Sequence, residues 1–377
     1  MKSKTSHGYD ELSSKIIKQC SDQLSKPLSL ICNICLITGT FPDRMKYAVI
    51  IPLHKKDAVV EHVSARSQSA EVIDGRGIAA AVREELRREV ARWVSGGRRR
   101  PQLTAVCVGE DPASAVYVRN KMVAAKEVGI ESRTLRLPKE VTEEVLLDTI
   151  GRLNADADVD GILVQTPLPE HVSERAVCDA VAPGKDVDCF NAANVARFCL
   201  GTGVLVPCTA LAVREILRRA GIETRGKHAV VCGRSKHVGW PIAMLLHAGG
   251  TGKNGWMDAT TTICHRHTPP DQLALITRSA DIIVSAAGVP NLIKSSMVKR
   301  GACVIDVGIT RITDSAGKKR LVGDVDFKEV SEVAGHITRV PGGVGPVTVS
   351  MLMRNTVVAA KQMAEWDESK PQGRNVM

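Results

Sequence analysis

The chain has 377 residues, of which 44% are hydrophobic and 24% charged, with Gly 31 and Pro 17, an ordinary globular composition. This length leaves room for two domains with buried cores, and the composition excludes a collagen-like or low-complexity chain. The formal net charge is +10, to which residues 1–69 contribute +4 through ten Lys or Arg and six Asp or Glu. The remaining +6 is mild and suits an enzyme for anionic small molecules as well as a nucleic-acid-binding protein.

No segment predicts a membrane span or a signal peptide. The nearest apolar run, residues 27–41, is interrupted by Ser, Asn, Thr and Gly, whereas a spanning helix needs about 20 apolar residues. A mitochondrial transit peptide is rich in Arg and Ser and poor in acids, and only residues 63–69 resemble the end of one. The eleven cysteines lie mostly in apolar runs, so we expect them to be reduced. Cys32 and Cys35 have the spacing of half a zinc site, but no second pair follows.

From about Val72 onward, apolar β-branched runs alternate with amphipathic segments. The apolar runs predict buried parallel strands at 104–109, 160–165, 228–233, 260–265, 281–288 and 303–309. The amphipathic segments predict helices over 79–92, 115–128, 142–153, 211–220, 240–247 and 270–279. Strand and helix repeated in this way predict a doubly wound α/β architecture.

Polar residues at strand ends and on one helix predict a catalytic site. Tyr117 and Lys121 are four residues apart, so a helix would present both on one face, where the lysine could act in acid–base chemistry. This spacing alone is weak, and an exposed helix face is the alternative. Gln165 follows a predicted strand, where open α/β sheets bind ligands. Asp186 and Asp188 lie in the next loop, where a carboxylate could accept ring N–H groups or only form a turn.

Two glycine-rich segments favour a phosphate-binding site. Gly233 and Gly239 bound a turn between a predicted strand and helix, so that backbone N–H groups and the helix dipole could hold a pyrophosphate. The turn lacks the full G-x-G-x-x-G pattern, and residues 340–348 form a second glycine-rich crossing. Residues 250–255 (GTGKNG) do not form a Walker A loop, and we interpret them as a mobile loop.

Five signatures in order, YxxxK, VQxPLP, KDVD, GRSxxVGxP and PGGVGPxT, resemble those of the bifunctional methylenetetrahydrofolate dehydrogenase/cyclohydrolases over about Val72 to Lys361. The resemblance implies two α/β domains with the active-site cleft between them. The folate-binding catalytic domain is expected over 70–205, with a helix at 347–365 returning to it. A Rossmann-type NAD(P)-binding domain is expected over 206–340, followed by a tail at 366–377. It also implies a homodimer, and we expect no nucleic-acid or membrane partner.

The same resemblance implies roles for individual residues in oxidising 5,10-methylenetetrahydrofolate and hydrolysing the methenyl product to 10-formyltetrahydrofolate. Lys121 would be the main catalytic group, with Tyr117 packed on the folate ring, Gln165 orienting Lys121 and Asp188 binding the pterin. The expected substrate-binding loop contains Pro341, Gly342 and Gly343. The expected cofactor-binding residues are Gly233, Arg234, Ser235, Gly239, Arg266, Ile309 and Thr348.

Within the family, GRSKHVGWPIAMLLH, DATTTICHRHTP and LVGDVDF look most like the mitochondrial NAD-linked branch. That branch implies NAD with Mg2+ and inorganic phosphate, with Arg234 and Arg266 on the phosphate and Asp258 on the metal. The alternative is an NADP-specific, cytosolic-type member in which an arginine reads the NADP phosphate directly. The resemblance implies a mitochondrial location, but without a clear transit peptide the cytoplasm is the alternative.

The chain departs from the family pattern at three positions. Cys189 replaces a glycine beside Asp188, and this loop is strained if the position requires a positive φ. Thr166 stands where an apolar residue is usual, and Arg339 replaces a proline. None of these changes removes an expected catalytic side chain, and weaker folate binding is the expected consequence.

Residues 8–57 have a different character and resemble a fragment of the reverse transcriptase of non-LTR retrotransposons. The Tyr-x-Asp-Asp motif of the polymerase occurs nowhere in the chain, so we expect no polymerase activity. The resemblance indicates an appended segment over residues 1–69 that packs poorly because it lacks the rest of its domain. A retroelement-derived nucleic-acid-binding product is the competing hypothesis, and it would show binding that weakens steeply with salt.

Overall fold

The computed structural model describes residues 69–249, 257–313, 317 and 319–369. The segment that resembles a reverse transcriptase, Cys32 and Cys35, the loop 250–255 and residues 370–377 all lie outside the described residues. Within the described ranges, no helix is long and apolar enough to cross a membrane. The cysteines of these ranges are free, and most of them are buried.

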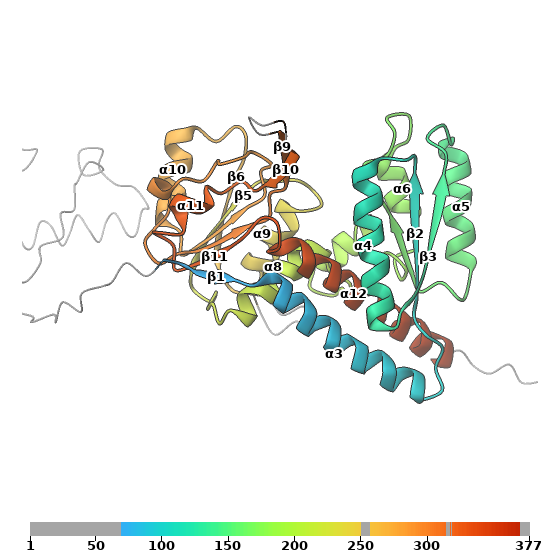
Figure 1. The fold of residues 1–377 in the computed structure, drawn as a ribbon. Helices are drawn as coiled ribbons and strands as arrows, with labels where there is room; N and C mark the ends of the chain where they lie inside the picture. Colours follow the sequence, from blue (N-terminus) through green and yellow to red (C-terminus); the bar gives the residue numbers. More distant parts are fainter. Residues whose placement is uncertain (1–68, 250–256, 314–316, 318, 370–377) are drawn as a thin grey trace, which may run out of the picture. The chain divides into compact units, whose positions relative to one another are not determined.

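The larger sheet is parallel and six-stranded (Figure 1). Its order is β1 (Glu71–Ile73), β11 (His336–Thr338), β8 (Cys303–Asp306), β7 (Ile282–Ser285), β5 (His228–Cys232) and β6 (Thr260–Cys264). The chain runs from β5 to β6 on one side and then returns to β7 on the other side of β5. This reversal is a topological switch point, and ligands of open α/β sheets bind outside the carboxyl ends of the strands there.

Helices and one hairpin complete this half of the protein. They are α8 (Cys208–Arg219), α9 (Gly239–His247), α10 (Pro270–Ser279), α11 (Phe327–Val330), a 3-10 turn at Ser295–Met297 and the antiparallel pair β9 (Thr310–Thr313) and β10 (Lys319–Val322). Strand β1 was expected in the first domain, but it pairs with β11 in register Glu71 to His336. The two halves are therefore interleaved along the chain.

The smaller sheet is parallel and three-stranded. Its order is β3 (Glu131–Leu137), β2 (Gln102–Val108) and β4 (Gly161–Val164), with helices α4 (Pro112–Val128), α5 (Glu143–Ala155), α6 (Glu174–Ala180) and α7 (Ala192–Cys199) in the same half. Strand β2 is central and buried along most of its length, which agrees with its continuous apolar run.

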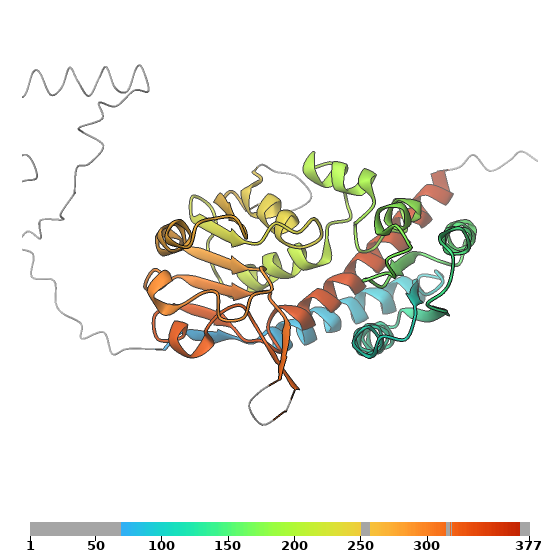
Figure 2. The same ribbon diagram turned by 90° about the horizontal axis from the view of Figure 1, so that it is seen from above.

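Two long helices connect the halves. Helices α3 (Gly75–Ser95) and α12 (Val344–Ser369) lie side by side, and α12 also packs against α8 and α4 (Figures 1 and 2). The buried face of α3 carries Ala79, Val82, Leu86 and Val90 at helical spacing. Because α12 contacts elements of both halves, it fixes the edge of the space between them.

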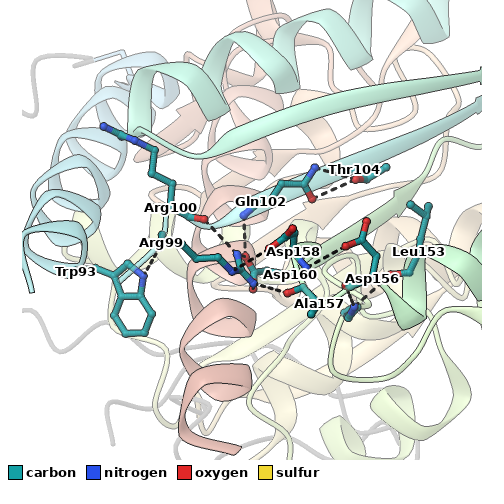
Figure 3. Close-up of polar contacts among 11 residues, drawn as sticks. Trp93, Arg99, Arg100, Gln102, Thr104, Leu153, Asp156, Ala157, Asp158 and Asp160 are labelled. Carbon is teal, nitrogen blue, oxygen red and sulfur yellow. Dashed lines mark hydrogen bonds and ion pairs between the residues drawn. The ribbon is translucent and has the colours of Figure 1, made fainter. Parts of the chain in front are cut away.

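A buried carboxylate anchors the amino end of the smaller sheet (Figure 3). Asp160 is 1% exposed and directly precedes β4. Arg99 donates two hydrogen bonds to it, Nη1 to Oδ2 at 2.7 Å and Nη2 to Oδ1 at 2.8 Å. The backbone N–H of Gln102, at the start of β2, donates to Oδ2 at 2.8 Å. The forked guanidinium contact compensates the buried charge and holds β2 and β4 in register.

Candidate active site

A cleft of about 730 Å³, called here the larger cleft, lies between the two halves. Its walls come from α3, α4, the loops after β7 and β8, and the turn before α12. Eight of the residues expected at the site line it: Tyr117, Lys121, Ser235, Ile309, Pro341, Gly342, Gly343 and Thr348. These residues come from both halves, so the expected interdomain cleft is present.

Helix α4 presents Tyr117 and Lys121 to the larger cleft. It begins at an Asp111 cap, whose side chain accepts the Ser114 N–H at 2.7 Å, and ends at Gly129 with φ 88°. Tyr117 is 41% exposed, which leaves its ring available to a ligand. The predicted shared face of Tyr117 and Lys121 is therefore realised, and it faces the cleft rather than open solvent.

Gln165 accepts a hydrogen bond from the Lys121 side chain. Lys121 Nζ donates to Gln165 Oε1 at 3.2 Å. The other end of the amide, Gln165 Nε2, donates to the backbone carbonyl of Thr166 at 2.7 Å. Since the amide nitrogen is engaged, its oxygen must point to Lys121. The departure at Thr166 leaves this contact intact because only its backbone takes part.

A smaller cavity of about 160 Å³ adjoins Lys121 and contains Asp188. Burial raises the pKa of Asp188 to about 6, although the positive charge of Lys121 opposes the rise. The neighbouring Asp186 accepts hydrogen bonds from the Asn191 N–H at 2.8 Å and from Asn194 Nδ2 at 3.0 Å. Asp186 therefore braces the loop, while Asp188 remains available to a ligand in the cavity.

Cys189, next to Asp188, has φ 62° and is fully buried. The position thus requires the left-handed backbone that favours glycine, as the sequence suggested, and a cysteine occupies it under strain. Its Sγ lies 3.4 Å from the carbonyl oxygen of Leu205. The third departure, Arg339, lines the larger cleft and lies over the ring of Phe327, with Cζ 5.1 Å from the ring centroid.

The glycine turn between β5 and α9 passes close to the loop after β7. A Cβ on Gly233 would lie 2.3 Å from the Ala286 carbonyl oxygen, and one on Gly239 would lie 2.3 Å from the Gly233 carbonyl oxygen. Ser235 Oγ accepts the Gly239 N–H at 3.2 Å. The turn therefore lies at the switch point between β5 and β7, as a dinucleotide site requires, and only glycine fits its closest approaches.

Two buried carboxylates shape the opposite wall of the larger cleft. Asp324 Oδ2 accepts the Ala287 N–H at 2.7 Å and the Gly288 N–H at 3.2 Å, in the loop after β7. Asp306, at the end of β8, accepts the Gly308 N–H at 3.1 Å. Burial raises the pKa of Asp306 to about 7, and the charge of Asp324 adds to the rise. Sequence reasoning had assigned neither residue a role.

Asp258 lies before β6, whereas the two arginines expected to share its site follow β5 and β6. Asp258 precedes the first residue of β6 and Arg266 follows the last, so a strand roughly 13 Å long lies between them. The Asp258 carbonyl accepts the Gly226 N–H at 2.9 Å, at the amino end of the sheet. Within the described ranges, no three His, Cys, Asp or Glu side chains are grouped to hold a metal ion.

Arg234 and Arg266, in contrast, lie at the same edge of the sheet. Cys232 pairs with Cys264 at the ends of β5 and β6, and each arginine follows its strand by two residues. Both side chains belong to exposed residues. Two guanidiniums on adjacent strand ends are a suitable arrangement for binding a phosphate group.

Three further residues at the site were not found from the sequence. Arg76 and Arg83 of α3 line the larger cleft, and Arg83 contacts Glu127 Oε2 at 2.8 Å and Ser350 Oγ at 3.2 Å. His237, in the glycine turn, lines the smaller cavity. Arg83 could have been found from the sequence because it is an arginine on the mostly apolar side of an amphipathic helix. The sequence around His237 gave no comparable signal.

Two family models match the chain. One is described as tetrahydrofolate dehydrogenase/cyclohydrolase, catalytic domain, and matches residues 73–188. The other is described as the NAD(P)-binding domain of the same family and matches residues 207–364. Together they cover most of both halves, and residues 1–72, 189–206 and 365–377 lie outside the two matches.

Individual relatives agree with the family models. A mitochondrial bifunctional methylenetetrahydrofolate dehydrogenase/cyclohydrolase of Gallus gallus is 56% identical over 303 residues, which are 80% of this chain and 90% of the relative. The structure of a 5,10-methylenetetrahydrofolate dehydrogenase from the silkworm Bombyx mori is 52% identical, with a TM-score of 0.75, and covers 78% of this chain and 99% of that chain. A Trypanosoma brucei dehydrogenase-cyclohydrolase, complexed with NADP and an inhibitor, is 43% identical with a TM-score of 0.73 over 78% and 99% of the two chains.

Proposed function

Because the chain belongs to the tetrahydrofolate dehydrogenase/cyclohydrolase family, we propose that it oxidises 5,10-methylenetetrahydrofolate with a nicotinamide dinucleotide and hydrolyses the methenyl product to 10-formyltetrahydrofolate. The observation that carries this proposal is the contact between Lys121 Nζ and Gln165 Oε1, because Lys121 lines both the larger cleft and the smaller cavity. We propose that folate and dinucleotide meet at this amine, which one amide holds.

Lys121 is the acid–base group of this proposal. A bound nicotinamide supplies the acceptor for the hydride that leaves the one-carbon unit. In the hydrolysis, a water molecule forms a bond to the methenyl carbon and loses a proton, which the neutral form of the Lys121 amine is placed to take. The bond between this carbon and N5 then breaks and N5 gains a proton, which leaves the formyl group on N10. Gln165 accepts one Nζ hydrogen and so directs the rest of the amine into the cleft. The exposed Tyr117 ring offers an apolar face on which the folate ring packs.

Asp188 binds the pterin in this proposal. Its carboxylate lies in the smaller cavity beside Lys121 and accepts the N–H groups of the ring. The Pro341–Gly343 segment closes the cleft against α3, since a Cβ on Gly75 would lie 2.0 Å from the Gly343 carbonyl oxygen. The pterin is thus bound between the two halves.

The dinucleotide is assigned to the glycine turn, with Ser235, Ile309 and Thr348 on the cleft wall. We propose that Arg234 and Arg266 bind one phosphate, either inorganic phosphate beside NAD or the 2′-phosphate of NADP. In the first case, Asp258 is the carboxylate proposed to hold Mg2+ beside the phosphate. Titration of inorganic phosphate with NAD as cofactor distinguishes these alternatives. Only a site for inorganic phosphate beside NAD predicts that the dehydrogenase rate depends on free phosphate.

The family resemblance supports two further proposals. The relatives at about this identity are named as mitochondrial, so we assign the chain to the mitochondrial branch and test it by locating the tagged protein. We also propose that it is a homodimer, which sedimentation velocity of the purified protein tests.

The domain limits proposed are 70–205 with the helix 347–365 for the folate domain, and 206–340 for the dinucleotide domain. Strand β1 is added to the six-stranded sheet of the dinucleotide domain.

The decisive test replaces Lys121 and a matched lysine on the same helix. Lys121→Met keeps the length of the side chain and removes its amine, and it should abolish the cyclohydrolase. Lys126→Met changes an exposed lysine in the last turn of α4 and should leave both rates unchanged. For both variants the cyclohydrolase rate is measured with methenyltetrahydrofolate, and the dehydrogenase rate with 5,10-methylenetetrahydrofolate and the dinucleotide, each by absorbance. A Lys121→Met protein with normal cyclohydrolase rates refutes the assignment.

A further inference from the structure

The glycine turn has two sides, and they face two different cavities. Ser235 and Val238 line the larger cleft, where the dinucleotide is assigned, while His237 lines the smaller cavity that contains Asp188. These residues are adjacent in one short turn between β5 and α9. The backbone of this turn therefore joins the walls of the two cavities.

His237 reaches across from the dinucleotide half to the folate half. Its Nε2 lies 3.0 Å from Glu174 Oε1, at the first residue of α6. Because a carboxylate is only an acceptor, Nε2 carries the hydrogen and donates it. Glu174 is held at the start of α6 by the Ser173 cap, so the acceptor is on a fixed element.

The same ring makes a second contact with the folate half. The centroid of His237 lies 4.0 Å from that of Phe190, with the rings tilted by 44°. Phe190 follows Asp188 by two residues, and its carbonyl accepts a hydrogen bond from Arg175 Nη2 at 2.8 Å. The positive charge that His237 can carry also lowers the pKa of Asp188. One side chain thus contacts both α6 and the loop that presents the pterin ligand.

We propose that His237 is a positioning residue that couples dinucleotide binding to folate binding, by tying the glycine turn to Glu174 and Phe190. This inference rests on the proposed function, since it requires that both ligands bind. The contacts of His237 join the turn assigned to the dinucleotide to α6 and to the loop that contains Asp188, so a dinucleotide that favours this position of the turn also favours this position of the loop. Linkage makes the effect reciprocal, so bound folate should tighten dinucleotide binding by the same factor.

The test measures dinucleotide affinity of the full chain by titration calorimetry, with and without saturating tetrahydrofolate, using NAD and then NADP. We expect tetrahydrofolate to tighten the wild-type dissociation constant by about fivefold or more, in the range usual for coupled sites. His237→Ala should reduce that factor to about one while leaving the dissociation constant without tetrahydrofolate within about twofold of wild type. Lys236→Ala, an exposed neighbour in the same turn, should keep the wild-type factor.

Glu174→Gln is the second variant, because the amide oxygen of the glutamine still accepts the hydrogen bond from His237. Glutamine also has nearly the size and shape of glutamate, so the protein should fold as before. It should retain most of the coupling, and Glu174→Ala should lose it. Coupling that is absent in wild type, or that survives in both His237→Ala and Glu174→Ala, overturns the inference. Failure of the proposed function gives a different result, since the wild type would then bind neither dinucleotide nor tetrahydrofolate.

Discussion

The strained backbone at Cys189 gives a prediction that separates backbone strain from packing. Cys189 has φ 62° and is fully buried. Cys189→Ala removes the thiol and keeps the strain, and it should cost about 1 kcal/mol because one buried sulfur atom is lost. Cys189→Gly removes the side chain and the strain together. The difference between the free energies of unfolding of these two variants therefore measures the backbone strain at residue 189.

At an unstrained buried site, changing Ala to Gly destabilises by roughly 1.2–1.8 kcal/mol. About 0.8 kcal/mol is the lost burial of a methyl group, and about 0.4–1 kcal/mol is the extra freedom of glycine in the unfolded chain. At residue 189 the relief of a left-handed Cβ offsets this by about 1–2 kcal/mol. The Ala and Gly variants at this position should therefore differ in their free energy of unfolding by less than about 0.8 kcal/mol.

Urea denaturation followed by circular dichroism measures these free energies. Ala280→Gly is the matched control, because Ala280 is buried, follows the end of α10 and has φ −78°. It should show the full loss of roughly 1.2–1.8 kcal/mol. If the step from Ala to Gly at residue 189 costs as much as the control, the backbone there is not strained and the reasoning fails.

Three further results are expected. Burial raises the pKa of Asp188 to about 6, so its carboxyl group loses its proton between pH 5 and pH 7. If the ionised form accepts the N–H groups of the pterin, the KM for folate should fall about tenfold over this range. Asp188→Asn should show a flat initial-rate profile, and a retained slope would assign the titration to another group. Arg99→Ala leaves the carboxylate of Asp160 buried without its guanidinium and should lower the free energy of unfolding by about 2–3 kcal/mol in urea; an unchanged midpoint would contradict the anchoring role. Arg234→Ala and Arg266→Ala should each raise the KM for dinucleotide about tenfold or more with kcat less affected, and equal KM values in wild type and both variants would remove the phosphate site.

The buried strands were predictable because their chemistry is local. Strands β2, β5, β7 and β8 are apolar runs with β-branched residues, and each lies where such a run was expected. Strand β3 was not predicted because its sequence, ESRTLRL, begins with four polar or charged residues and contains no continuous apolar run. It pairs with β2 alone, so only one of its edges is bonded and polar side chains are tolerated.

The site was predictable only as far as short-range spacing determines it. Tyr117 and Lys121 share a helix face by periodicity, and Gln165 follows a strand end, so their meeting could be anticipated. His237 and Glu174 are distant in sequence, and nothing local indicates their contact. Asp258 and Arg266 were assigned to one site by the family resemblance alone, because β6 lies between them and their spacing along the chain does not indicate a contact.

The pairing of β1 with β11 has a consequence for how the chain is made. Glu71 emerges early, but its partner His336 follows about 260 residues later, which is roughly 15–50 s at ~5–20 residues per second. During that time the first strand is an open edge attached to a helix that waits for α12. The sheet of the dinucleotide half therefore cannot be completed until the folate half and β11 have both been synthesised. If translation stalls before β11, β1 is left as an unpaired strand that can pair with other chains, and a chaperone that covers it would prevent this.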